Sequence, residues 1–311
     1  MLKYYGKRIL LVILTVFVVA SITFFLVHLI PGDPLDVAAR KLPDQIRANF
    51  YAKYGLDLPL YQQYGLFVKN LAHGDLGDSM VNAGRSVGDT IKRAAPISGR
   101  IGIQAVFLGF FVGLTLGIIA AFNRNRWPDY IVMILAILGV SIPSFVMAAL
   151  LQYFLTVKIQ ILPTTWTSGG FRDTILPTLA LCFGSIATYA RYMRSSVLEI
   201  TGQDYVLTAK SKGVSSFAMV IKHILRNAIL PAITILGPQL AGIFVGSFVI
   251  ETIFSIPGFG QIYTMSIQNK DYSMVMGQTV VFTTMLIFSY LLVDILYGLA
   301  DPRIRVSGGK R

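Results

Sequence analysis

Six stretches of the sequence are apolar over about 20 residues, the length that a helix needs to cross a bilayer. They cover roughly residues 9–30, 101–122, 130–157, 175–190, 228–250 and 276–300. Within lipid every backbone N–H and C=O group must be paired inside the protein, and a helix pairs these groups within one segment. The sequence therefore predicts an all-α membrane protein with six transmembrane helices.

The composition agrees with this prediction. Of the 311 residues, 54% are hydrophobic and 14% are charged, whereas about a quarter of a soluble domain is charged. The formal net charge is +12, but the basic residues are scattered at the ends of apolar runs rather than grouped with exposed aromatic residues, which argues against a nucleic-acid partner. The one cysteine, Cys182, excludes an internal disulfide and is typical of a small buried hydrophobe.

Basic residues also predict the orientation. Lys3, Lys7 and Arg8 precede the first run, which is longer than the apolar part of a signal peptide and lacks a following cleavage site. This pattern predicts an uncleaved helix with a cytoplasmic N-terminus, and six crossings then place the C-terminus and residues 191–227 on the same side. That side holds 15 Lys and Arg against four acidic residues, as the positive-inside rule requires. Residues 31–100 are predicted to form an extracytoplasmic loop or subdomain.

The basic loop between the fourth and fifth runs has its own helix signals. Thr201 and Asp204 have the [ST]-x-x-[DE] spacing of a helix cap, and Gly213 can close that helix in a left-handed conformation. A second short helix is predicted to start at Ser215 or Ser216. Its apolar stripe consists of Phe217, Val220, Ile221, Ile224 and Leu225. Two capped helices with such a stripe favour a docking surface over an ordinary solvated connector.

Two further patterns predict how the helices pack. Gly109, Gly113 and Gly117 recur every four residues, which places three small residues on one helix face and lets a second helix approach closely. Pro143 removes a backbone donor from the third run, so that run is predicted to kink there.

No pattern indicates catalysis or metal binding. The motifs G-x-x-x-x-G-K-[ST] and H-E-x-x-H are absent from the sequence, and His28, His73 and His223 are dispersed. Asp294 is an acidic residue inside the last run, where such residues are often functional. Its position near the cytoplasmic end favours pairing with Arg303 over a role in transport. These patterns assign no residues to a translocation path.

Several short motifs together resemble those of one transport family. They are Pro31-Gly32-Asp33-Pro34, Tyr54-Gly55-Leu56-Asp57, Gly74-Asp75-Leu76-Gly77, Ser141-Ile142-Pro143-Ser144-Phe145, Asp204-Tyr205-Val206-Leu207-Thr208-Ala209-Lys210-Ser211-Lys212-Gly213, His223-Ile224-Leu225-Arg226-Asn227-Ala228-Ile229-Leu230-Pro231, Glu251-Thr252-Ile253-Phe254, Ile256-Pro257-Gly258-Phe259-Gly260 and Asp301-Pro302-Arg303. Each is weak alone, but their order and spacing are specific. Over nearly its full length the chain resembles the inner-membrane permease subunits of ATP-binding-cassette importers for oligopeptides, dipeptides or nickel.

The resemblance implies a type I importer permease fold, with residues 1–311 as a single transmembrane permease domain and 191–227 as a cytoplasmic coupling-helix loop. In such importers a loop motif, often written EAA with a later glycine, inserts into a cleft of the ATPase. Ala209 and Gly213 match that motif, whereas Leu207 and Thr208 depart from it. The coupling residues implied are Asp204, Tyr205, Thr208, Ala209, Lys212, Gly213, His223, Arg226 and Asn227.

The resemblance also implies the partners. They are a second, similar permease in a heterodimer, two ATP-binding subunits that hold ATP and Mg²⁺, and an extracytoplasmic peptide-binding protein. No cofactor and no catalytic residue is then expected in this chain, which would lie in the cytoplasmic (inner or plasma) membrane of a prokaryote. Oligopeptides are the preferred substrate on overall similarity, with dipeptides or nickel as alternatives. A secondary carrier is a weaker alternative, because no convincing repeat relates the two halves.

Overall fold

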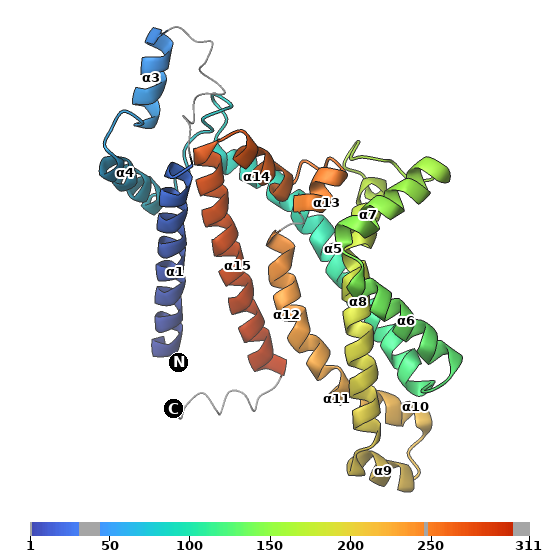
Figure 1. Cartoon of the computed structure of the whole chain (residues 1–311). Helices are drawn as coiled ribbons and strands as arrows, with labels where there is room; N and C mark the ends of the chain where they lie inside the picture. Colours follow the sequence, from blue (N-terminus) through green and yellow to red (C-terminus); the bar gives the residue numbers. More distant parts are fainter. Residues whose placement is uncertain (1, 31–43, 246–247, 301–311) are drawn as a thin grey trace. The chain divides into compact units, whose positions relative to one another are not determined.

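The computed structural model describes residues 2–30, 44–245 and 248–300 (Figure 1). These residues are mostly helical, and the only β-type pairing among them is an isolated bridge between Asp78 and Ser86. The motifs at 31–34 and 301–303, including Arg303, lie outside the described residues. The chain divides into two compact units, the first from residues up to 98 with 257–287 and the second from 99–256 with the residues after 287.

The first unit contains helices from both ends of the chain. They are α1 (Leu2–His28), α3 (Asp44–Tyr54), α4 (Leu60–Ala72), the start of α5 (Val87–Phe122), α14 (Phe259–Gln268) and the start of α15 (Tyr272–Ala300). Phe24 of α1 is buried at its centre, where its ring stacks on Phe67 at 5.4 Å between centroids and lies 4.2 Å from the ring of His28. Most of the remaining surface of α1 is exposed and apolar.

The second unit contains the rest of α5 and the central helices. They are α6 (Trp127–Ser141), α7 (Ser144–Gln152) with a π-helical turn (Tyr153–Lys158), α8 (Phe171–Thr201), α9 (Asp204–Ser211), α10 (Ser216–Met219), a second π-helical turn (Val220–Leu225), α11 (Arg226–Ala228), α12 (Leu230–Val245) and α13 (Phe248–Ile253). Helix α8 packs along α6 and also contacts α7 and α12.

Three helices in the described part of the chain are long and apolar enough to cross a membrane. They cover Ile9–His28, Val87–Phe122 and Tyr272–Leu291. A fourth is added if α6 and α7 with its π-helical turn count as one broken span. Membrane spans are therefore present as predicted, while the number six and the orientation of the termini stay predictions.

The predicted kink at Pro143 is confirmed, and the structure makes it a complete break. The two helical segments on either side of it are bent by 105°. Proline has no N–H for the helical hydrogen bond, and its ring collides with the preceding turn of a straight helix. Residues 130–157 therefore do not form the continuous helix that their hydropathy suggested.

The predicted glycine stripe on α5 is also confirmed as a packing feature. A Cβ atom added at Gly113 would lie 2.6 Å from the Cβ of Tyr189, and one added at Gly117 would lie 2.6 Å from the carbonyl oxygen of Ala190. The α5 and α8 backbones therefore approach closely at these glycines, as small residues allow.

An ion pair joins α8 to the beginning of α6. The Arg194 guanidinium donates to both carboxylate oxygens of Asp129, at 2.5 and 2.7 Å. Asp129 also accepts a hydrogen bond from the backbone N–H of Asn125 in the preceding turn. Such a two-pronged contact fixes the relative position of the two helices.

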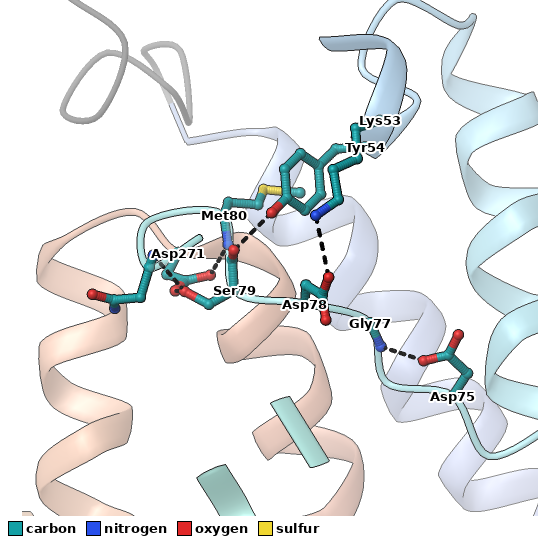
Figure 2. A network of polar contacts seen from close by, with 9 residues as sticks. Lys53, Tyr54, Asp75, Gly77, Asp78, Ser79, Met80 and Asp271 are labelled. Atoms are coloured by element: carbon teal, nitrogen blue, oxygen red, sulfur yellow. Dashed lines mark hydrogen bonds and ion pairs between the residues drawn. The ribbon is translucent and has the colours of Figure 1, made fainter. Parts of the chain in front are cut away.

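A polar network organises the loop at residues 74–86 of the first unit, which we call the Asp271 loop (Figure 2). Asp271, 2% exposed, accepts hydrogen bonds from the Ser79 hydroxyl and from the backbone N–H of Met80. At the rim the Tyr54 hydroxyl donates to the Ser79 carbonyl at 2.8 Å, and Lys53 pairs with Asp78 at 3.3 Å. A carboxylate just before α15 therefore holds a loop almost 200 residues away in sequence.

Candidate coupling loop

Helix α8 extends well beyond the apolar run that predicted it. It ends at Thr201, whose hydroxyl donates to the Val197 carbonyl at 2.6 Å. Thr201 therefore does not cap the next helix, and that prediction was wrong. Gln203 occupies the N-cap of α9 and makes no side-chain hydrogen bond there. The physical reason is that a threonine inside a helix can bond to the carbonyl four residues earlier instead of capping the following helix.

The predicted end of α9 at Gly213 is confirmed. This residue has a φ of 75°, in the left-handed region where glycine is favoured. The Val214 N–H returns to the Ala209 carbonyl at 3.2 Å, which pairs one of the last carbonyls of the helix. The chain turns sharply here, as Figure 1 shows between α9 and α10.

The second helix begins as predicted but does not stay short. Ser215 accepts a hydrogen bond from the N–H of Ala218 at 3.4 Å, so it caps α10. The helical path then continues through the π-helical turn and α11, and after Ile229 it enters α12. The predicted second helix is thus the first part of a long helical path that leads into the fifth apolar run.

We call residues 202–219 the coupling hairpin. Its inner face is apolar: Val206 and Ala209, 3% and 7% exposed, belong to one buried cluster with Val197 of α8 and with Met219 and Ile224. Burying this apolar surface is what holds α9 against its neighbours. Ala209, which the motif singled out, therefore lies in the interior of the hairpin.

A side-chain amide connects α9 to the helical path formed by α10, the second π-helical turn and α11, which we call the returning helix. Asn227 donates through Nδ2 to the Tyr205 hydroxyl at 3.0 Å and to the His223 carbonyl at 3.1 Å. His223 is half-buried and Arg226 is exposed. Three of the predicted site residues are thus brought together by direct hydrogen bonds. Sequence reasoning did not find this contact because 22 residues separate Asn227 from Tyr205.

The outer face of the hairpin exposes both apolar and polar groups. Leu207 is 53% and Tyr205 42% exposed, and Asp204, Thr208, Lys212 and Gly213 are exposed beside them. The motif comparison identifies Leu207 only as a departure. Its exposure next to buried Val206 places it on the surface of the hairpin, and the helical period could have indicated this. Whether these residues contact an ATPase stays a prediction.

No three His, Cys, Asp or Glu side chains come together in the described residues in a group that could hold a metal ion. Asp294 lies in α15, but its side chain is outside the described part of the structure, so its predicted pairing stays a prediction.

Sequence comparison places the chain among transport proteins of the inner membrane. Residues 113–306 match the profile of the binding-protein-dependent transport system inner membrane component, and residues 1–97 match the corresponding N-terminal profile. The chain belongs to this family of binding-protein-dependent transport system inner membrane components.

Similar proteins match over almost the whole chain. The dipeptide transport system permease protein DppB of Bacillus subtilis is 43% identical over 98% of this chain and 99% of its own length. The oligopeptide transport system permease protein OppB of Haemophilus influenzae is 41% identical over 98% of this chain and 100% of its own. A chain from a structure of the MetNI methionine ABC transporter has a TM-score of 0.48 at 18% identity, covering 69% of this chain and 94% of that one.

Proposed function

We propose that this chain is the membrane-spanning permease subunit of an ATP-driven importer, which carries peptides across the cytoplasmic membrane of a prokaryote by alternating access. The observation that supports this most directly is the 41–43% identity, over 98% of the chain, to permease proteins named for dipeptide and oligopeptide transport. Oligopeptides are the preferred substrate. Dipeptides are the second candidate, because the DppB relative, at 43% identity, is slightly more similar than the OppB relative at 41%.

The proposed membrane arrangement is the six-helix, type I importer fold, with both termini and the coupling hairpin on the cytoplasmic side. The three clear spans support it, as does the excess of basic residues in the loops assigned to that side. The Asp271 loop and helices α3 and α4 then lie outside, where an extracytoplasmic peptide-binding protein would dock. The remaining partners are a second, homologous permease and two ATP-binding subunits, which hold the ATP and Mg²⁺.

The coupling hairpin is the proposed contact with the ATPase. It is built to move as one body, because its inner face is a packed apolar cluster and Asn227 bonds across it to Tyr205. A turn of two residues joins α8 to α9 of the hairpin, and the helical path that follows the hairpin leads into α12. A movement imposed on the hairpin would therefore tilt α8 and α12 together. In alternating access the permease has two arrangements, one open to each side of the membrane. The ATPase shifts the equilibrium between them because its affinity for the two arrangements differs.

Gly213 offers a sharp test of this contact. A Cβ atom added there would meet nothing within 4 Å in this chain, so a large side chain would project into open space or into a partner. Asn tolerates the left-handed conformation better than other residues, and Gly213→Asn is therefore the matched control for Gly213→Trp. We expect wild type and Gly213→Asn to co-purify with ATP-binding subunits from native membranes in mild detergent. Gly213→Trp should remain in the membrane but lose both these subunits and peptide uptake.

Two results would contradict different parts of the proposal. If the wild-type chain is recovered alone in several detergents and its membranes show no ATP-dependent peptide uptake, the importer assignment is wrong. If Gly213→Trp retains full uptake and its ATP-binding subunits, the importer stands but the hairpin is not the contact.

A further inference from the structure

A cavity of about 400 Å³ lies in the second unit, where α6 breaks from α7. Its lining includes Pro143 and Ser144 at the break, Gly184 and Thr188 of α8, and Gln239 of α12. Non-helical backbone inside a membrane-spanning segment is tolerated where it is buried in protein or lines a cavity. The broken α6–α7 pair is apolar enough to span, and the residues at its break do line a cavity.

The break leaves a backbone acceptor without its helical donor. In a continuous helix the Gly139 carbonyl would accept from the N–H of residue 143, but that residue is proline and has no N–H. Gly139 lines the cavity, and a Cβ added at Gly184 would lie 3.6 Å from its carbonyl oxygen, so this oxygen faces α8. The Thr188 hydroxyl donates its proton to the Gly184 carbonyl at 2.9 Å and keeps its own oxygen as an acceptor.

Gln239 of α12 supplies a third acceptor. Its side-chain oxygen Oε1 is buried and has no hydrogen-bond partner among the described residues. A buried acceptor without a donor destabilises a protein, so such groups are uncommon and often bind something the structure does not contain. The residues that line this cavity are all uncharged. The site therefore offers neutral hydrogen-bond acceptors and no charge.

We propose that this cavity is a station on the translocation path, where the oxygens of Gln239, Thr188 and Gly139 accept hydrogen bonds from the backbone N–H groups of a peptide in transit. The inference rests on the proposed function and assigns residues to its path. Backbone N–H groups occur in every peptide, so neutral acceptors bind peptides whatever their side chains. The small residues Ser144 and Gly184 leave room, and the volume lies in the range of about 300–1,000 Å³ typical of ligand sites.

The test compares an ordinary tripeptide with its backbone N-methylated analogue, which lacks the N–H donors. Uptake of each is measured in vesicles containing the complete importer, with saturating peptide-loaded binding protein. We expect wild type to prefer the ordinary peptide. In Gln239→Leu its uptake should fall by about threefold to tenfold, as the loss of one neutral hydrogen bond predicts. Uptake of the analogue should stay unchanged, so the preference shrinks.

Gln152→Leu is the matched control, because Gln152 lies in α7 outside the cavity lining and bonds to the Thr164 carbonyl. This variant should keep the wild-type preference. An unchanged preference in Gln239→Leu, with ordinary uptake by wild type, would overturn the inference and leave the proposed function standing. Absence of peptide uptake by wild type would overturn both.

A second measurement decides the matter if Gln239→Leu does not assemble. Ser144→Cys is made together with Cys182→Ala, so that the only thiol of this chain lies in the cavity, and labelling is measured on this chain after its separation from the other subunits. A small water-soluble thiol reagent should label it, and saturating transported peptide should slow the labelling at least threefold. If labelling is equally fast with and without peptide, the cavity is a water-filled packing gap and not a station on the path.

Discussion

The coupling hairpin and the Asp271 loop are held in place by opposite means. The hairpin relies on apolar packing of Val206 and Ala209 against α8 and the returning helix, with one amide contact at its edge. The Asp271 loop relies on a buried carboxylate that binds a hydroxyl and a backbone N–H. Packing is non-directional and tolerates small shifts, whereas a carboxylate network is directional and loses much when one partner is removed. The two regions should therefore fail under different substitutions.

The largest effect is expected when a charge is placed in the apolar cluster that holds the coupling hairpin. Val206→Asp places an unpaired carboxylate in the buried cluster and should destabilise the chain by about 3–5 kcal/mol. The neighbouring variant Leu207→Asp places the same charge on the exposed face and should cost little stability. Thermal unfolding of the two purified variants in detergent measures the difference.

This pair of variants also separates folding from docking. Leu207→Asp should unfold near the wild-type temperature yet bind the ATP-binding subunits more weakly, if the proposed contact is correct. Equal stability of Val206→Asp and Leu207→Asp would mean that the hairpin is not held by its inner face.

The second-largest effect is expected when the carboxylate that holds the Asp271 loop is removed. Asp271→Ala leaves the Ser79 hydroxyl and the Met80 N–H without their acceptor in a buried position, and should cost about 2–3 kcal/mol. Asp75→Ala is the control, since this exposed carboxylate only accepts from the Gly77 N–H at 2.8 Å. Protease cleavage within residues 74–86 should accelerate strongly in Asp271→Ala and slightly in Asp75→Ala. Similar cleavage rates in both variants would show that Asp271 does not anchor the loop.

The features that sequence reasoning predicted correctly depend on local backbone constraints. Gly213 closes α9 because its left-handed conformation is open to glycine, and Pro143 breaks its helix because it lacks an N–H. Both constraints act within a few residues, so a single sequence reveals them. The family resemblance likewise followed from short motifs in a fixed order.

The features that were missed depend on contacts between distant residues or on competition between equivalent bonds. Asp271 and Ser79 are 192 positions apart, and no periodicity connects them. Thr201 could cap α9 or bond back to Val197, and only the continuation of α8 decides between the two. The cavity at Pro143 needs α12 to supply Gln239, so it also could not be seen in any one segment.

The smallest effect is expected at alkaline pH from Tyr54 and Lys53, which lie at the rim of the Asp271 loop. Burial raises the pKa of Tyr54 above its usual 10.0, and the hydrogen bond to Asp78 raises the pKa of Lys53 above 10.5. A group with a raised folded-state pKa contributes stability below its unfolded pKa and loses that contribution as the pH rises through the folded value.

Tyr54→Phe, which removes the donor to the Ser79 carbonyl, should therefore cost about 1 kcal/mol at neutral pH. That difference from wild type should stay constant up to about pH 9 and shrink as the pH rises above about 10. Lys53→Met, made in wild type and in Tyr54→Phe, separates the titration of Lys53 from that of Tyr54. The exposed ion pair between Lys53 and Asp78 should weaken with added salt. Thermal unfolding in detergent across this range measures all four proteins, and a Tyr54→Phe difference that stays constant with pH would mean that the hydroxyl does not hold the loop.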